Sequence, residues 1–430
     1  MEEQPSLFAG KFVDLYGAPS YTISHMPTAD ETASAQHRSF GEVFRIFLRL
    51  GLTSFGGPMA HLGYFRGEFV VRRQWLDESA FADLVALCQF LPGPASSQVG
   101  FALGLSRGGL RGGLAAWLGF TLPSALALFL FALFAGSLNG PIAAAALHGL
   151  KIVAVAVVAQ AVWGMARTLV SDVQRGVIAV GGALLAVFVP GSLAQIATIL
   201  SGAILGMIFC RQAPAAPVGQ LSFLISRRLG IAALAAFSAI LFGLPFAAAK
   251  LHSHALVLFE AFYRSGALVF GGGHVVLPLL KAAIVDPGLV SANAFLSGYG
   301  AAQAVPGPLF TVSAYLGAVA EIPPNGLAGA AIALLGIFLP GMLILLGTLP
   351  FWDAFRKRVS AQALMRGVNA AVVGILAAAL YNPVWTGAVY SARDFALALA
   401  GFLLLTFWKC PPWIVVAATA ASAVALAMLA

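Results

Sequence analysis

The chain has 430 residues, of which 60% are hydrophobic and only 9% carry a charge. Soluble proteins contain about 45–50% apolar and about 25% charged residues, so this composition excludes an ordinary set of soluble domains. Long, nearly uncharged apolar runs recur along the chain, and such runs are typical of membrane spans. The sequence therefore predicts an all-α polytopic membrane protein.

The net charge of +8 does not indicate nucleic-acid binding, because the bases occur singly or in groups of two or three between apolar runs. In membrane proteins such residues mainly set the orientation of the spans. The three cysteines lie far apart, in or at the ends of apolar segments, and are interpreted as small apolar side chains. We expect no enzymatic activity, no cofactor and no metal site.

Residues 1–40 are mixed and polar, without the basic and apolar regions of a signal peptide, and are interpreted as a cytosolic tail. Glycine and proline are frequent in the apolar segments that follow, which membrane helices tolerate but which marks breaks. In chain order, the predicted segments are 41–65, 80–104, 112–136, 141–166, 176–190, 193–210, 229–249, 255–280, 293–319, 326–350, 361–381, 394–408 and 412–430.

These segments contain two copies of one pattern about 215 residues apart. The first shared motif is F-x-R-x-G-x-x-x-F-G-G and the second is Q-x-x-P-G-P. The corresponding positions are 47–57 with 262–272, 89–94 with 303–308, Gly119 with Gly336, Pro123 with Pro340, and Gly149 with Gly367. Because these anchors keep the same order and nearly the same offset, the chain is interpreted as two homologous halves.

Loop charges indicate that the two halves are inverted. The loop after the first P-G-P motif carries Arg107 and Arg111, whereas its counterpart has no base and one acid, Glu321. One span later the bias reverses, with no base at 136–141 and three bases at 356–358. Since basic loops favour the cytosolic side, equivalent loops should lie on opposite sides, as in many secondary transporters.

This topology divides the chain into a cytosolic tail, two transporter repeats and a linker. It places the N-terminus in the cytoplasm and the C-terminus on the periplasmic side. The charges do not decide whether the F-G-G and P-G-P segments cross the membrane once or turn back, and we favour broken, hairpin-like elements. The predicted domains are the tail 1–40, the first repeat 41–210, a linker with one connecting span 211–254, and the second, inverted repeat 255–430.

The breaks themselves predict an anion site. Pro58 and Pro94 are expected to begin new half-helices in the first half and Pro308 in the second, where Gly273 replaces the first proline. Helix N-termini inside a membrane offer backbone N–H groups and about half a positive charge, which suits an anion without any fixed base. The alternative is a packing break that lets helices cross closely.

Inversion would bring the breaks of both halves together near mid-membrane. The predicted substrate-binding residues of the first half are Arg49, Gly56, Gly57, Pro58, Gln89, Pro92, Gly93, Pro94, Ser96 and Ser97. Those of the second half are Arg264, Gly271, Gly272, Gln303, Pro306, Gly307, Pro308 and Thr311.

Charged and titratable residues in the apolar segments form a second set of candidates, because such residues are costly in a membrane. Arg49 and Arg264 match in the repeat and are interpreted as anion ligands or gates; the alternative is that their heads reach the lipid head groups. His61, Asp83 and His274 are candidates for proton coupling. The alternatives are hydrogen-bonded structural histidines and an aspartate paired with a nearby arginine.

The duplicated F-x-R-x-G-x-x-x-F-G-G and Q-x-x-P-G-P motifs resemble those of the chromate ion transporter family, over residues 40 to about 430. The resemblance implies a long, two-domain protein of the bacterial inner membrane that exports chromate and confers chromate resistance. Its partners would be chromate and the lipid bilayer, and the sequence is compatible with a homodimer. Gly273, where the first half has Pro58, departs from the motif, so the two half-sites need not be equivalent.

Export is the direction that physics favours for this substrate. Chromate is a dianion near neutral pH, and a potential that is negative inside favours its exit by about 4.6 kcal/mol per 100 mV, twice the value for one charge. No P-loop for ATP is present. Sulfate has the same charge and shape, so a sulfate or other oxyanion transporter is the alternative.

Two other classes of protein fit less well. A membrane enzyme would need clustered acids for a metal, or a His/Arg/Ser constellation, and the acids here are spread singly. A channel or a purely structural protein is the remaining class, against which broken helices in matched halves favour alternating access.

Overall fold

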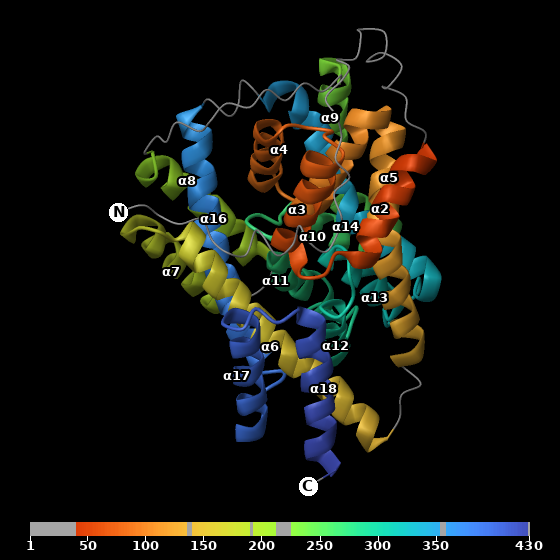
Figure 1. The fold of residues 1–430 in the computed structure, drawn as a ribbon. Coiled ribbons are helices and arrows are strands. Elements are labelled where there is room, and N and C mark those ends of the chain that lie inside the picture. Colours follow the sequence, from red (N-terminus) through yellow and green to blue (C-terminus); the bar gives the residue numbers. More distant parts are fainter. Residues whose placement is uncertain (1–39, 136–139, 190–191, 212–224, 353–357, 429–430) are drawn as a thin grey trace, which may run out of the picture. The chain divides into compact units, whose positions relative to one another are not determined.

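The computed structural model describes residues 40–135, 140–189, 192–211, 225–352 and 358–428. The predicted tail, apart from Phe40, lies outside these residues, as do Arg356 and Lys357 and the loop 136–139. Every regular element in the described part of the chain is helical, which confirms the all-α fold. Residues from Ser39 to Ala430 form one compact unit (Figure 1).

The first half begins with two helix pairs and continues with longer helices. Its elements are α2 (Phe40–Thr53), α3 (Gly57–Phe65), η1 (Arg66–Arg72), α4 (Glu78–Phe90), α5 (Ala95–Ala135), α6 (Pro141–Leu169), α7 (Val173–Phe188) and α8 (Ser192–Phe209). The connecting helix is α9 (Arg227–Leu251).

The second half repeats this order. Its elements are α10 (His254–Ala267), η2 (Gly273–Val275), α11 (Val276–Leu280), η3 (Lys281–Val285), α12 (Ala292–Ala302), η4 (Leu309–Thr311), α13 (Val312–Ala318), α14 (Gly326–Thr348), η5 (Leu349–Phe351), α16 (Val359–Ala379), η6 (Leu380–Trp385), α17 (Ala392–Thr406) and α18 (Pro412–Met428). Helices long and apolar enough to cross a membrane are Ala95–Phe134, Pro141–Leu169, Arg227–Leu251, Gly326–Phe351 and Val359–Trp385.

Helix α5 is two helices joined by a sharp turn. The backbone leaves helical geometry at Gly108 and Gly109, and Gly109 has φ 58°, a conformation that glycine adopts without strain. The segment before this turn corresponds to η4 and α13, and the segment after it corresponds to α14. The two halves therefore contain the same series of elements.

The F-G-G segment of the first half is a hairpin. Phe47, on α2, contacts Phe65 and Phe69, with ring centroids 5.8 and 5.1 Å away. Phe47 lies about as far before the break at Ser54–Gly56 as Phe65 lies after it. Because these two residues are in contact, the chain turns back at the break instead of continuing across the membrane.

The P-G-P segments turn back in the same way. The guanidinium of Arg107, at the end of the first part of α5, lies 4.9 Å from the ring centroid of Trp75, which precedes α4. In the second half Glu321 N donates to Leu289 O at 2.9 Å, and these two residues hold the corresponding positions after α13 and before α12. The prediction of broken, hairpin-like elements is confirmed.

One exposed ion pair joins the two first-half hairpins at their ends, and two more form in and beside η1. Arg66 Nε lies 2.6 Å from a carboxylate oxygen of Glu78, at the start of α4. Glu68 accepts from Arg73 at 2.6 Å and from Arg72 at 2.9 Å. Burial disfavours the charged form of Glu68, but the hydrogen bonds from Arg73 and Arg72 outweigh it and hold the pKa of this carboxyl below its usual value.

The halves are interlocked through their long helices. Helix α6 of the first half packs against α17 and α18 of the second, and α16 packs against α7 and α8 of the first. The anchor glycines of the repeat lie at these contacts: a Cβ on Gly149 would lie 2.6 Å from Ala420 Cα, and one on Gly367 would overlap the backbone of Gly202 and Gly206. The long helices α6 and α16 thus each pack against a pair of helices from the other half.

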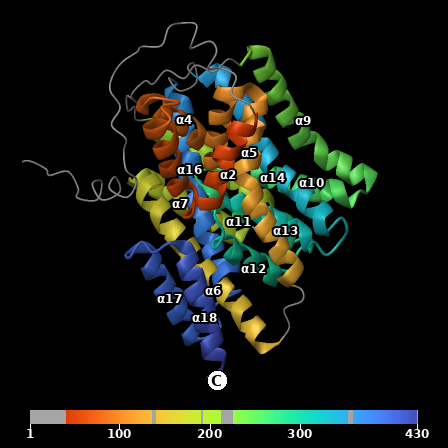
Figure 2. The ribbon, with the colours of Figure 1, turned by 45° about the vertical axis from the view of Figure 1, so that its right-hand side comes forward.

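Corresponding elements lie toward opposite ends of this unit. Helix α4 lies in the upper part of Figures 1 and 2, whereas its counterpart α12 lies in the lower part, near α17 and α18. This arrangement agrees with inverted halves.

Inversion predicts opposite sides for Arg107 and Glu321. In a Cys410→Ser background, which removes the one cysteine that is not buried, we expect an impermeant maleimide applied to whole cells to label only one of Arg107→Cys and Glu321→Cys. Arg111→Cys should behave as Arg107→Cys does. Labelling of both Arg107→Cys and Glu321→Cys from the same side would contradict inversion.

Candidate functional site

The breaks of the two halves meet at a pair of backbone hydrogen bonds. Gly93 N, in the first P-G-P loop, donates to Val269 O in the second-half F-G-G segment at 2.8 Å. Gly307 N, in the second P-G-P loop, donates to Ser54 O in the first-half F-G-G segment at 2.9 Å. These four residues correspond pairwise in the repeat, so the two contacts are related by the internal symmetry.

Glycine at these two positions permits the close crossing. Gly93 and Gly307 have φ of 122° and 97°, which side chains rarely adopt. A Cβ on Gly93 would lie 3.0 Å from Gly341 Cα, and one on Gly307 would lie 2.8 Å from Ser124 Oγ. The N–H groups of both glycines are used within the protein, so free donors at these breaks must come from the helix starts that follow them.

Pro58 and Gly273, which correspond in the repeat, lie against each other. A Cβ on Gly273 would lie 3.1 Å from Pro58 Cγ. Two residues related by the symmetry are in contact only near its axis, where two proline rings would compete for one space. The departure of the second motif from the first therefore has a steric reason.

Gly273→Pro should lower stability, because the new ring must displace Pro58; overpacking of this kind costs about 1–3 kcal/mol. We expect a lower thermal unfolding midpoint in detergent, and recovery of most of it in the double variant Pro58→Gly/Gly273→Pro. A single variant as stable as the wild type would show that the two positions do not compete.

Buried polar side chains surround the crossing loops. His61 Nδ1, on α3, lies 3.3 Å from Ser96 Oγ in the first turn of α5. Gln98 Nε2 donates to Pro92 O and to Gly341 O, both at 2.9 Å, and so ties the first P-G-P loop to α14. Four hydroxyls in this region, those of Ser54, Ser97, Thr121 and Ser313, are buried and have no hydrogen-bond partner among the described residues; a fifth, that of Thr406, lies on α17.

These hydroxyls give the site its chemistry. A buried hydroxyl without a partner costs about 1–3 kcal/mol, so such groups mark places where water or a ligand completes the hydrogen bonding. The first turn of α5, which contains Ser96 and Ser97, adds N–H groups that have no acceptor within the helix. Neutral donors of this kind can solvate an anion without a fixed positive charge.

The two repeat-matched arginines lie away from the loop contacts. Arg49 is exposed on α2. Arg264, on α10, has its Nε 3.1 Å from a carboxylate oxygen of Glu260 one turn earlier. Position 260 corresponds to Arg45 in the first half, so the two arginines have different electrostatic surroundings.

Other predicted residues have partners of their own. His274 Nδ1 lies 2.7 Å from Tyr299 Oη, on α12. Asp83 is buried on α4 and accepts a hydrogen bond from Trp352 Nε1 at 3.3 Å. In the second P-G-P region, Thr311 Oγ1 donates to Pro308 O at 2.7 Å.

The two glutamines and the remaining motif residues lie at the ends of helices or in the break loops. Gln89 is exposed on α4, and Gln303 is half-buried at the end of α12. The remaining predicted residues lie in the break loops or at their edges and are Gly56, Gly57, Pro94, Gly271, Gly272 and Pro306.

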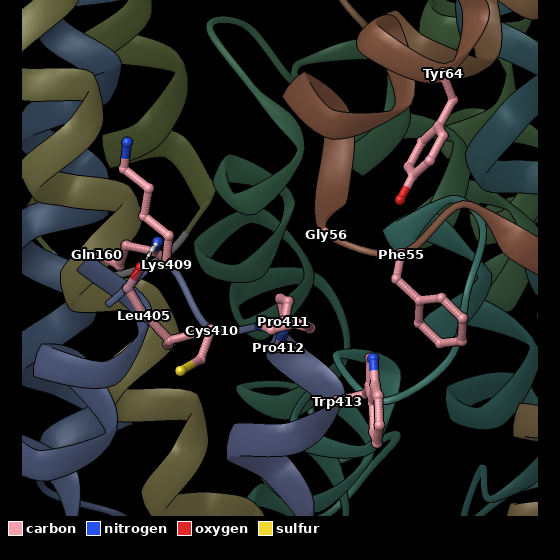
Figure 3. Close-up of a pocket in the computed structure, with 10 residues that line it drawn as sticks. All are labelled: Phe55, Gly56, Tyr64, Gln160, Leu405, Lys409, Cys410, Pro411, Pro412 and Trp413. Carbon is pink, nitrogen blue, oxygen red and sulfur yellow. Dashed lines mark hydrogen bonds between the residues drawn. The ribbon is translucent and has the colours of Figure 1, made fainter. Parts of the chain in front are cut away.

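A cavity of about 390 Å³ opens beside the first-half F-G-G segment. Figure 3 shows Phe55 and Gly56 on one wall and the loop between α17 and α18 on the other. Tyr64, Gln160 and Lys409 add polar groups to its lining. These three residues lie outside the repeated motifs, so no motif predicts them; the one available indication was a lone lysine between two apolar segments.

The family sequence model described as chromate transporter matches the chain twice, over residues 41–207 and 256–425. The chain belongs to the chromate transporter family. It is 28% identical to the chromate transport protein of Pseudomonas aeruginosa over 91% of this chain and 92% of that one. It is 26% identical to the chromate transport protein of Cupriavidus metallidurans, over 87% and 90% of the two chains.

An uncharacterized transporter of Methanocaldococcus jannaschii is 25% identical, over 81% of this chain and 85% of that one. No solved structure matches the chain. The two family matches coincide with the two series of helices, so the family's sequence unit is one half of the interlocked fold.

Proposed function

We propose that this protein is a secondary transporter that exports chromate across the bacterial inner membrane and thereby confers chromate resistance. The dianion would bind near mid-membrane, at half-helix N-termini where the breaks of both halves cross. Membership of the chromate transporter family supports the substrate. The observation that carries the site is the symmetric crossing of the two P-G-P loops with the F-G-G segments, among buried hydroxyls without partners.

The site would work with neutral donors. Hydroxyls and helix-start N–H groups stabilise a dianion, but without a full opposite charge they also release it. Inverted halves provide two related conformations, each open to one side of the membrane. A site held by two crossing loops, one from each half, would change its exposure when the halves move relative to each other.

The membrane potential supplies a driving force in the proposed direction. With the N-terminus in the cytoplasm and the C-terminus in the periplasm, outward movement of two negative charges is favoured by about 4.6 kcal/mol per 100 mV. Neither a cofactor nor a metal enters this scheme. Sulfate remains the alternative substrate, because hydroxyl and N–H donors recognise charge and shape that the two anions share.

Replacing the prolines at the breaks tests the site. Pro94→Ala and Pro308→Ala should each loosen the backbone at the start of the following helix and misplace the helix-start N–H groups, so we expect chromate transport to fall at least tenfold. The measurement is chromate uptake into inverted membrane vesicles at matched expression, with sulfate as competitor.

Pro245→Ala is the matched control, because this proline lies inside α9 and is exposed. It should transport as the wild type does. Wild-type rates in both break variants would reject the proposed site, and transport of sulfate in preference to chromate would select the alternative substrate.

The arginines are tested by exchange for lysine. If Arg49 and Arg264 bind the anion, Arg49→Lys and Arg264→Lys should impair transport, since lysine lacks the planar fork that suits an oxyanion. Because the halves are inverted, we expect Arg49 to act on capture of internal chromate and Arg264 on its release. Initial efflux rates against internal chromate distinguish these effects.

Arg45→Lys is the control, one turn from Arg49 on the same helix and also exposed. Wild-type kinetics in both test variants would assign the two arginines to the lipid interface, where lysine serves equally well.

A further inference from the structure

The cavity beside the first-half F-G-G segment is built from both halves. Phe55 and Gly56 come from the break after α2, whereas Lys409 and Trp413 come from the region between α17 and α18 (Figure 3). The rings of Phe55 and Trp413 are in contact, with centroids 6.3 Å apart. The cavity therefore reaches the backbone of one crossing loop directly.

The loop that carries Lys409 lies level with the middle part of α6. Gln160, on α6, donates from Nε2 to Leu405 O at 3.1 Å. Gln160 precedes the end of the 29-residue α6 by nine residues, which is about 14 Å along the helix. Helix α17 has 15 residues, about 22 Å, and is too short to span a hydrocarbon core of about 30 Å. Lys409 is exposed and lines the same cavity as Gln160, so it is a base near the level of the middle part of α6.

Lys409 has no carboxylate within ion-pair distance among the residues that the structure describes. No acid lines the cavity either; its other polar groups include the Tyr64 hydroxyl, the Gln160 amide and the Trp413 indole. A cation at such depth is costly unless it meets water or an anion. The cavity offers room for both, with donors and no competing negative charge.

A second, much smaller cavity lies in the second half. It is lined by Gln195, Arg264, Leu268 and Leu279 and has a volume of about 10 Å³. Leu279 corresponds in the repeat to Tyr64, but Arg264 corresponds to Arg49 and not to Lys409, and it is paired with Glu260. The large cavity thus has a base without a carboxylate partner among the described residues, whereas the base at the small cavity is paired.

We propose that the open cavity is an entry site for a tetrahedral oxyanion dianion, with Lys409 as the charge that draws it to the crossing loops. This inference rests on the proposed function and names a binding residue outside the repeated motifs. The anion would meet Lys409 first and then exchange it for the neutral donors at the breaks, so the lysine acts on capture and not on the final site.

Cys410, next to Lys409, makes a direct test available in the unmodified protein. Cys88 and Cys210 are buried, whereas Cys410 is half-exposed and lines the cavity. Its rates of reaction with an anionic and a cationic methanethiosulfonate of similar size report the local electrostatic potential. We expect the anionic reagent to react faster in the wild type, and the ratio of rates to fall at least threefold in Lys409→Gln and to recover in Lys409→Arg.

Transport supplies the second measurement. Lys409→Gln should raise the half-saturating chromate concentration about tenfold with little change in maximal rate, and Lys409→Arg should stay near the wild type. Lys250→Gln is the control, an exposed lysine at the end of α9 away from the cavity. Lys409→Met, which keeps the length of the side chain, replaces the glutamine variant if that protein does not reach the membrane.

Two results would overturn the inference: a ratio of thiol-reagent rates that does not depend on Lys409, or unchanged half-saturation in the neutral variants. Failure of the proposed function looks different, because the wild type would then not move chromate. In that event the reagent ratio and its dependence on Lys409 still decide whether the cavity is an anion site.

Discussion

Two backbone hydrogen bonds, from Gly93 N to Val269 O and from Gly307 N to Ser54 O, fix the centre of this structure. Each joins a break in one half to a break in the other, so neither half can complete its central loops alone. Interrupted backbone inside a membrane is tolerated only where protein or water satisfies it, and here the opposite half does so. The hairpins, the buried hydroxyls and the cavity all take their positions from this crossing.

Much of the fold could be predicted from the sequence because the two halves of the repeat can be compared with each other. Matched glycines and prolines located the breaks, and opposite loop charges at Arg107 and Glu321 indicated inversion. Packing partners could not be predicted: Gly149 and Gly367 stood out as anchors, but an apolar helix face with a glycine does not say which helix it meets. Contact of α6 with α17 and α18 depends on the three-dimensional crossing of the halves.

The candidate site was only partly accessible from sequence. Proline chemistry predicts where helices restart, and Ser96 and Ser97 follow from that. The sequence does not predict that the Gly93 and Gly307 N–H groups are bonded within the protein, because each bonds to a segment more than a hundred residues away. Lys409 was missed for a related reason: the fold, and no local motif, brings it to the same cavity as Phe55 and Gln160.

The exchange of helix pairs between the halves has a consequence for synthesis. Helix α6 is synthesised more than two hundred residues before α17 and α18, against which its glycine-bearing face packs. Until then lipid or another helix must cover that face. The nascent chain therefore passes through a stage in which its first half is inserted but unfinished, and that stage is where a cell's quality control would find a truncated product.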